Sequence, residues 1–253
     1  MTAQYPDLKN SSVLITGGAS GIGADIVRAF CQQGAKVAFI DIDAVAAQQL
    51  ITELVEEGNS APVFSYCDLA ELDTIRAVID KLSESCGAFT VLVNNAASDN
   101  RHSPQELTPD YWRNRLDVNV GQQFFCAQAV HQYMREQKRG SIINLGSVSY
   151  QMALPDLTAY ATSKAAVVGL SRSLAREWGA DNIRVNTLVP GCVMTEKQLK
   201  LWITAEDEAK IQQQQCLKKR IVGADIANMS LFLASQSSSA CSAQEFIVDG
   251  GII

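Results

Sequence analysis

The sequence contains no run of about 18 or more apolar residues, so no segment is long enough to cross a membrane as a helix. The first residues, Met1 to Asp7, also lack the basic start and the apolar core of a secretory signal peptide. These two absences predict a soluble, cytoplasmic protein without a membrane partner.

Paired cysteine motifs and an excess of positive charge are missing as well. The seven cysteines are odd in number and form no C-x-x-C motif, which argues against a disulfide framework or a zinc site, and we expect no bound metal. The net charge is -6 at pH 7, and the short basic run 218–220 does not reverse it. We therefore expect no nucleic-acid partner.

The sequence does contain a regular alternation of short apolar runs and amphipathic stretches of helical length. The apolar runs lack in-and-out alternation, which is typical of parallel strands that are buried on both faces. The pattern predicts an α/β fold, a single Rossmann-type domain over residues 1–253 with a doubly wound parallel sheet of about seven strands and helices on both faces. The predicted strands are 13–15, 37–40, 63–66, 91–93, 142–145, 185–189 and 246–248, and the predicted helices are 22–33, 43–57, 71–86, 109–138, 158–180 and 223–235.

Residues 192–222 interrupt this alternation between the sixth predicted strand and the last predicted helix. Ligands of doubly wound sheets bind at the carboxyl ends of the strands, where such an insertion would lie. We therefore expect residues 192–222 to form a substrate lid.

A glycine-rich turn follows the first predicted strand and opens the first predicted helix. Its glycines, Gly17, Gly21 and Gly23, have the spacing G-x-x-x-G-x-G, so the amides and dipole at the start of the helix would face a pyrophosphate. This spacing differs from the usual G-x-G-x-x-G fingerprint, and glycine-rich turns occur in many loops. The strand before the turn and the helix after it favour a dinucleotide site.

Asp41 directly follows the second predicted strand, 18 residues after Gly23. A carboxylate there can accept hydrogen bonds from both hydroxyls of an adenosine ribose, whereas it repels a 2′-phosphate. The sequence therefore favours NAD over NADP as the cofactor. The alternative is that Asp41 only caps the following helix.

Tyr160 and Lys164 are four residues apart in a predicted helix and therefore share one of its faces. Ser147 follows the fifth predicted strand, at the carboxyl edge of the sheet, and Asn119 lies in the predicted helix 109–138. Each residue alone has an ordinary interpretation, since tyrosines pack, lysines are solvated and serines form turns. Together, beside a dinucleotide turn, they predict a catalytic site in which the tyrosine can act as a base.

A series of motifs runs through almost the whole chain, in an order and spacing that resemble the short-chain dehydrogenase/reductase family. One departure is Ala97, where many members have glycine, and its methyl group would narrow the space beside the cofactor without abolishing binding. The matching motifs are Thr16-Gly17-x-x-x-Gly21-x-Gly23, Asp68-Leu69, Asn94-Asn95-Ala96, Asn119, Ser147, Tyr160-x-x-x-Lys164, Pro190-Gly191-x-Val193-x-Thr195 and Asp249-Gly250-Gly251.

The resemblance implies a role for each motif residue. Tyr160 would be the catalytic base, Lys164 would bind the nicotinamide ribose, and Ser147 would hold the substrate oxygen. Asn119 would support a water chain that carries the proton away. The dinucleotide contacts that it implies are Gly17, Ser20, Gly21, Ile22, Asp41, Asp68 near the adenine, Leu69, Asn95 near the adenosine ribose, Tyr160, Lys164, Pro190, Val193 and Thr195, although Asp68-Leu69 could also be an ordinary helix start.

A tyrosine base must lose its proton near pH 7, although its ordinary pKa is near 10. The shift of about three units corresponds to roughly 4 kcal/mol. An ammonium about 5 Å away contributes on the order of 3 kcal/mol at an effective dielectric constant of about 20. We therefore expect Lys164 nearly to suffice, and the positive nicotinamide ring of oxidised NAD to supply the rest.

The substrate pocket would be formed by the loops 98–102 and 150–154 and the start of the lid, which are rich in hydrogen-bonding groups. Such a pocket suits a polyhydroxylated molecule better than a steroid or a fatty chain. These segments also resemble the bacterial aldose 1-dehydrogenases of the same family. The resemblance implies NAD-dependent oxidation of the anomeric C1 hydroxyl of a xylose-like pentose or a hexose to the lactone. The candidate sugar contacts are Asp99, Asn100, Ser147, Tyr150, Tyr160 and Gln198.

Two other functions stay open: a 3-ketoacyl carrier-protein reductase or other secondary alcohol or polyol dehydrogenase, and a dinucleotide-binding regulator without catalysis. Arg101 and His102 could form a surface salt bridge or anchor their loop, and we interpret His131 as structural. The family resemblance also implies a homotetramer that uses the helices 109–138 and 158–180 in one interface. The small residues of the second helix could equally pack on the protein's own sheet.

Overall fold

The computed structural model describes residues 3–253 and contains a sheet of seven parallel strands. Their order is β3-β2-β1-β4-β5-β6-β7, so the chain crosses from one half of the sheet to the other between β3 and β4, and the strand order reverses where β1 pairs with β4. The seven predicted strands are confirmed, with every end within two residues of the expected bound. The strands are β1 (Ser12–Thr16), β2 (Lys36–Asp41), β3 (Val63–Tyr66), β4 (Val91–Asn94), β5 (Gly140–Leu145), β6 (Ile183–Pro190) and β7 (Glu245–Val248).

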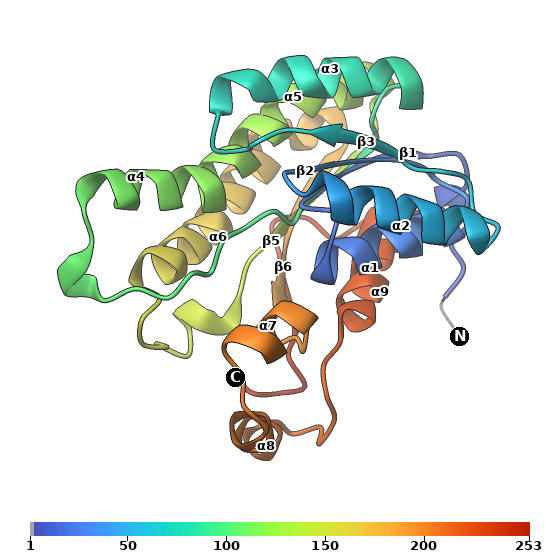
Figure 1. The fold of residues 1–253 in the computed structure, drawn as a ribbon. Coiled ribbons are helices and arrows are strands. Elements are labelled where there is room, and N and C mark those ends of the chain that lie inside the picture. The colour runs from blue at the N-terminus through green and yellow to red at the C-terminus, as the bar shows by residue number, and fades with distance from the viewer. Residues whose placement is uncertain (1–2) are drawn as a thin grey trace.

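Helices cover both faces of the sheet (Figure 1). Along β1, Val13 and Ile15 point into the core on one face and Leu14 into the core on the other, which explains the continuous apolar run. One face is covered by α1 (Gly21–Gln32), α2 (Ala44–Glu56) and α9 (Gly223–Ala234), and the other by α3 (Ile75–Cys86), α5 (Gln122–Gln137) and α6 (Thr158–Trp178).

The predicted helix 109–138 is divided in the structure. It consists of α4 (Pro109–Leu116), a π-helical turn (Asp117–Gly121) and α5. The turn holds Asn119, whose side chain accepts a hydrogen bond from the Ser98 amide at 2.7 Å and donates to the Ser98 carbonyl oxygen at 3.1 Å. Hydrophobic periodicity cannot reveal one inserted residue, because the segment remains helical on both sides of it.

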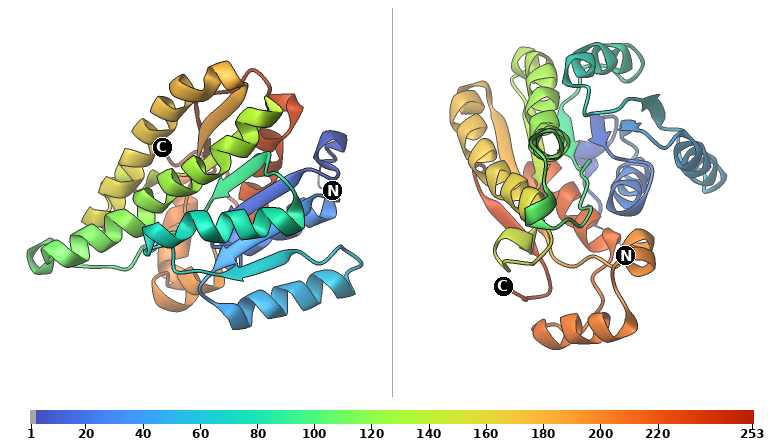
Figure 2. Two further views of the ribbon diagram at one scale, coloured as in Figure 1. Left: turned by 90° about the horizontal axis from the view of Figure 1, so that it is seen from above. Right: turned by 60° about the vertical axis from the view of Figure 1, so that its left-hand side comes forward.

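The segment 192–222 contains two helices, α7 (Glu196–Leu201) and α8 (Ala205–Gln214). Figure 1 and the right-hand view of Figure 2 show α8 standing away from the sheet and its covering helices. Within residues 3–253, no helix has the length and apolar character needed to span a membrane. The same part of the chain contains no group of three His, Cys, Asp or Glu side chains placed to hold a metal ion.

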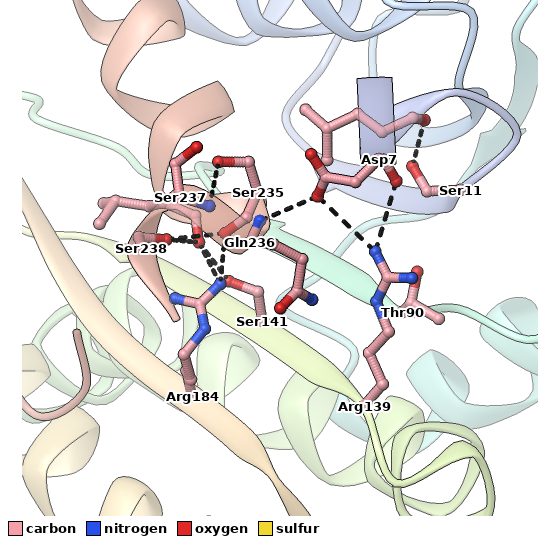
Figure 3. A network of polar contacts seen from close by, with 12 residues as sticks. Asp7, Ser11, Thr90, Arg139, Ser141, Arg184, Ser235, Gln236, Ser237 and Ser238 are labelled. Atoms are coloured by element: carbon pink, nitrogen blue, oxygen red, sulfur yellow. Dashed lines mark hydrogen bonds and ion pairs between the residues drawn. The ribbon is translucent and has the colours of Figure 1, made fainter. Parts of the chain in front are cut away.

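A network of polar contacts lies at the amino-terminal ends of the strands (Figure 3). Arg184 of β6 donates to the carbonyl oxygens of Leu233 at 2.6 Å and Ser235 at 3.3 Å, at the end of α9. Arg139 lies 3.9 Å from a carboxylate oxygen of Asp7. A cavity of about 540 Å³ lies at this edge. Because the Arg184 guanidinium faces carbonyl oxygens at the C-terminus of α9 and Arg139 pairs with Asp7, we interpret this network as structural.

Candidate active site

The glycine turn at the end of β1 has the geometry of a pyrophosphate cradle. Gly17 has a φ of +65°, which favours glycine, and a Cβ on Gly23 would lie 1.8 Å from the Gly17 carbonyl oxygen. Ser20, the N-cap residue of α1, makes no side-chain hydrogen bond to the first turn. The amides of that turn are therefore free to bind an anion, and the turn fits a dinucleotide.

Asn95, at the end of β4, braces this turn across the point where the strand order reverses. Its side-chain amide donates to the carbonyl oxygens of Thr16 at 3.1 Å and Gly17 at 2.8 Å. Its backbone amide donates to the Thr16 hydroxyl at 3.0 Å. Asn95 therefore fixes the cradle, while its predicted contact with the adenosine ribose stays a prediction.

Asp41, the last residue of β2, reaches the glycine turn. One carboxylate oxygen accepts the Ala19 amide at 2.8 Å, and the other accepts the amides of Ile42 at 2.7 Å and Asp43 at 3.0 Å. A carboxylate has about four acceptor positions, so the group is fixed in place and can still accept a hydroxyl. Asp43, not Asp41, caps α2 through the Ala46 amide.

The remaining predicted cofactor residues lie around the same edge. Asp68 is exposed and accepts the Ala70 amide at 2.9 Å, as in an ordinary turn, and Leu69 packs in the core. Thr195 caps α7, and its methyl group would lie 3.4 Å from a Cβ on Gly21. The start of the segment 192–222 therefore lies against the glycine turn. Pro190 ends β6, Ile22 is in the first turn of α1, and Val193 pairs with Ile221.

The structure brings Ser147, Tyr160 and Lys164 together at the end of β5. Lys164 is only 1% exposed, and its ammonium lies 5.5 Å from the centre of the Tyr160 ring. The same ammonium donates to the Leu145 carbonyl oxygen at 2.7 Å. The Ser147 hydroxyl accepts the Ser149 amide at 3.1 Å, which holds its side chain beside the strand end.

The structure does not show the large contribution of Lys164 to the acidification of Tyr160 that the sequence led us to expect. Burial raises the pKa of Tyr160 to about 12; the charge of Asp99 also raises it, and a hydrogen bond with Ser147 opposes the shift. Burial lowers the pKa of Lys164 to about 7, against the charge of Asp99. Desolvation in the folded protein disfavours the phenolate and the ammonium alike, and a sequence alone does not show it.

Asp99 connects the loop after β4 to α7. Its carboxylate accepts the Lys197 ammonium at 3.0 Å and the Gln198 side-chain amide at 2.5 Å. Burial raises the pKa of Asp99, but the hydrogen bonds and charge of Lys197, with Gln198, outweigh burial and lower it. Two residues later, the Arg101 guanidinium lies 5.6 Å from the centre of a Trp202 ring. These contacts hold the segment 192–222 against the edge of the sheet where Ser147, Tyr160 and Lys164 lie, which we call the catalytic edge.

The other two candidate sugar contacts are placed differently. The Tyr150 hydroxyl donates to a carboxylate oxygen of Glu245 at 2.7 Å, so it could only accept a hydrogen bond from a sugar hydroxyl while this bond is made. Asn100 is exposed, and its backbone carbonyl oxygen lies 3.0 Å from Nδ1 of His102. The structure therefore unites Asp99 and Gln198 with the catalytic edge but does not bring the Tyr150 hydroxyl there.

Sequence reasoning missed two residues of this edge. Lys197, the partner of Asp99, is separated from it by 98 positions, and a surface-type lysine gives no signal of such a contact. Arg115 donates to the Ser98 hydroxyl at 2.6 Å and so supports the loop that holds Asn119. Its position after a predicted loop and within a helix could have suggested a loop anchor.

Two curated proteins match the chain over nearly its full length. The chain is 44% identical over 251 residues to "Probable galactose dehydrogenase GalD" of Rhizobium meliloti (strain 1021), covering 99% of this chain and 98% of that protein. It is 45% identical over 250 residues to "D-xylose 1-dehydrogenase" of Caulobacter vibrioides (strain NA1000 / CB15N), again covering 99% and 98%. A family model described as Enoyl-(Acyl carrier protein) reductase matches residues 17–253.

Two solved structures with the same fold contain a nicotinamide dinucleotide. A 3-oxoacyl-[acyl-carrier protein] reductase with bound NAD from Brucella melitensis has a TM-score of 0.88 and 32% identity, covering 98% of this chain and 93% of that one. A gluconate 5-dehydrogenase from Burkholderia cenocepacia J2315 in complex with NADP and tartrate has a TM-score of 0.88 and 31% identity, covering 96% and 95%.

The fold, the site and the comparisons define an oxidoreductase that uses a nicotinamide dinucleotide and acts on CH–OH groups. The chain belongs to the short-chain dehydrogenase/reductase family. This confirms the resemblance drawn from the motifs.

Proposed function

We propose that the protein is an NAD-dependent aldose dehydrogenase that oxidises the anomeric C1 hydroxyl of a cyclic sugar to the lactone. The observation that carries this proposal is the Asp99 carboxylate, which accepts hydrogen bonds from Lys197 at 3.0 Å and Gln198 at 2.5 Å, and whose charge raises the pKa of both Tyr160 and Lys164. A carboxylate with ammonium and amide partners offers acceptors and donors to adjacent hydroxyl groups. An acyl chain would gain nothing from burying these groups.

The names of the two curated relatives support a sugar substrate, because one is called a galactose dehydrogenase and the other a D-xylose 1-dehydrogenase. Asp99 and Gln198 are the sugar contacts that we retain as the strongest candidates. Asn100 and Tyr150 stay weaker candidates because of the contacts described above.

In the proposed reaction, Tyr160 takes the proton of the C1 hydroxyl, Ser147 hydrogen-bonds the oxygen, and the C1–H electron pair leaves as hydride. The cofactor site formed by the glycine turn and Asp41 would hold oxidised NAD, which would supply the hydride acceptor and a positive charge beside Tyr160. Lys164, fixed on the Leu145 carbonyl oxygen, stabilises the phenolate of Tyr160. Asn119, held by Ser98 on the π-helical turn, is positioned to support proton release.

A panel of sugars tests the proposed function. The purified protein with NAD+ and xylose, arabinose, galactose, fucose, glucose or rhamnose should reduce the cofactor with at least one sugar, measured by the absorbance of the reduced nicotinamide. Turnover of acetoacetyl thioesters or simple secondary alcohols, with no reaction across the sugar panel, would instead identify the reductase or polyol dehydrogenase alternative. Cofactor binding without any turnover would indicate a regulator.

Asp99→Asn is expected to have two separable effects. Loss of a charged acceptor raises the KM for the sugar by about tenfold, since a hydrogen bond to a charged group contributes about 1.5–3 kcal/mol. Because the Asp99 charge raises the pKa of Tyr160, its removal lowers that pKa, and the acid limb of the kcat profile moves to lower pH. Steady-state kinetics against pH measure both.

Asp110→Asn is the matched control for this variant. Asp110 pairs with Arg113 at 2.8 Å on the exposed surface of α4, so neither KM nor the pH profile should change. If Asp99→Asn also left both unchanged, Asp99 would not be part of the sugar site.

We also propose a cytoplasmic homotetramer that uses α5 and α6 in one interface. Static light scattering of the purified protein should give a mass of about four chains, and a monomer would contradict this assembly.

A further inference from the structure

The catalytic helix α6 has no cap of its own. Its N-cap residue, Leu157, makes no side-chain hydrogen bond to the first turn, where a Ser, Thr, Asp or Asn would ordinarily serve. The amide of Ala159 donates instead to Nε2 of His102 at 3.1 Å. Ala159 is 0% exposed, so in the folded protein the imidazole and its neighbours shield this amide from water. A residue from the loop after β4 therefore caps the helix, one position before Tyr160.

Three contacts orient the imidazole for this bond. Nδ1 of His102 lies 3.0 Å from the Asn100 carbonyl oxygen. The His102 amide donates to the Asp156 carbonyl oxygen at 3.0 Å, just before the helix. Tyr111 packs its ring edge to face on the imidazole, with 5.5 Å between the ring centres, and its hydroxyl lies 3.5 Å from Nδ1, where it can accept from an Nδ1–H.

These partners determine the tautomer of His102. A carbonyl oxygen can only accept and an amide N–H can only donate, so Nδ1 must carry the hydrogen and Nε2 must have a free lone pair. A proton on Nε2 would remove the acceptor and place a donor against the buried Ala159 amide. The cap therefore requires neutral imidazole in its Nδ1–H form.

We propose that His102 is a positioning residue for catalysis, which caps α6 and thereby fixes the place of Tyr160 relative to Ser147 and Lys164. This role rests on the proposed use of Tyr160 as base, whereas the cap itself does not. The loop of His102 also holds Asn119 through Ser98 and α7 through Asp99, so one segment aligns the parts of the site. A small displacement of a catalytic group lowers the rate strongly because the reaction depends on its orientation.

Two variants separate the cap from the rest of the loop. In His102→Asn, the side-chain amide can take the place of Nδ1 and donate to the Asn100 carbonyl oxygen, but the side chain is too short to reach the Ala159 amide. Glutamine is one methylene longer, and its carbonyl oxygen can accept the Ala159 amide in place of Nε2. His102→Asn should lower kcat by about tenfold with the dissociation constant of NAD+ unchanged. His102→Gln should recover kcat to within about threefold of the natural enzyme.

The tautomer can be measured without a substrate. The sequence has only two histidines, so a protein with 15N-labelled histidine gives two pairs of ring-nitrogen signals, and the His131→Asn variant assigns each pair to its ring. The 15N shifts and ring proton couplings of His102 should show a protonated Nδ1 and an unprotonated Nε2 at neutral pH. This result would stand even if the sugar panel failed, so the two proposals can fail independently.

Either of two results would overturn the proposal. One is a His102 imidazole that is protonated on Nε2 at neutral pH. The other is a His102→Asn variant that folds, binds NAD+ and keeps the natural kcat. A third result would also contradict the proposal. If His102→Asn folds with a lower kcat and His102→Gln has an equally low kcat, the loss of activity does not come from the bond between His102 and the Ala159 amide.

Discussion

Replacing Tyr160 with phenylalanine should lower kcat by about 10²- to 10⁴-fold, the usual contribution of a general base, and leave the dissociation constant of NAD+ within a few-fold. The substitution removes one hydroxyl group and preserves the ring that packs 5.5 Å from the Lys164 ammonium. Stopped assays with the best sugar give kcat, and calorimetric titration gives cofactor affinity. Activity at the natural level would refute Tyr160 as the base.

The same variant tests how the site acidifies the phenol. Because burial raises the pKa of Tyr160 to about 12, it is protonated at neutral pH before cofactor binds. Positive charge from oxidised NAD lowers that pKa, so binding should release protons and become tighter as pH rises. In weakly buffered solution, Tyr160→Phe should release fewer protons than the natural protein. Tyr133→Phe is the control. The Tyr133 hydroxyl lies away from the site and donates to Asp80 at 2.7 Å, so this variant should release as many protons as the natural protein.

Changing Asp41 to asparagine should reduce the preference for NAD over NADP by at least about tenfold. The substitution keeps one oxygen to accept from the glycine turn but removes the negative charge that repels a 2′-phosphate. The ratio of kcat/KM for the two cofactors measures the preference, which we expect to favour NAD by about a hundredfold in the natural protein.

Asp43→Asn is the matched control for the cofactor experiment. Asp43 lies two residues further on and caps α2, so its substitution leaves the charge at position 41 in place and should preserve the preference. A natural protein that prefers NADP would show that the Asp41 carboxylate does not control the cofactor.

The sheet could be predicted because both faces of each inner strand are buried. Val13, Leu14 and Ile15 must all be apolar when helices cover the two sides of β1, and that requirement is visible in the residues themselves. The Tyr160 and Lys164 pair was predictable for a similar reason, since a spacing of four places two side chains on one helix face.

Other features depend on distances that a sequence does not contain. The π-helical turn at Asn119 leaves the helical pattern intact, so only its contact with Ser98 reveals it. The bonds from Lys197 to Asp99 and from Ala159 to His102 join segments that are far apart in the chain. The pKa of Tyr160 could not be predicted because the desolvation that dominates it depends on burial in the folded protein.

Oxidation of a sugar that carries deuterium at C1 is the most direct test of the proposed reaction. With the best sugar of the panel, the deuterium should appear on the nicotinamide ring of the reduced cofactor, the product should be the lactone, and kcat/KM should show a primary isotope effect if hydride transfer limits it. The contradicting result is a reduced cofactor that contains no deuterium together with a product that keeps its deuterium at C1. That result would show that another hydroxyl is oxidised.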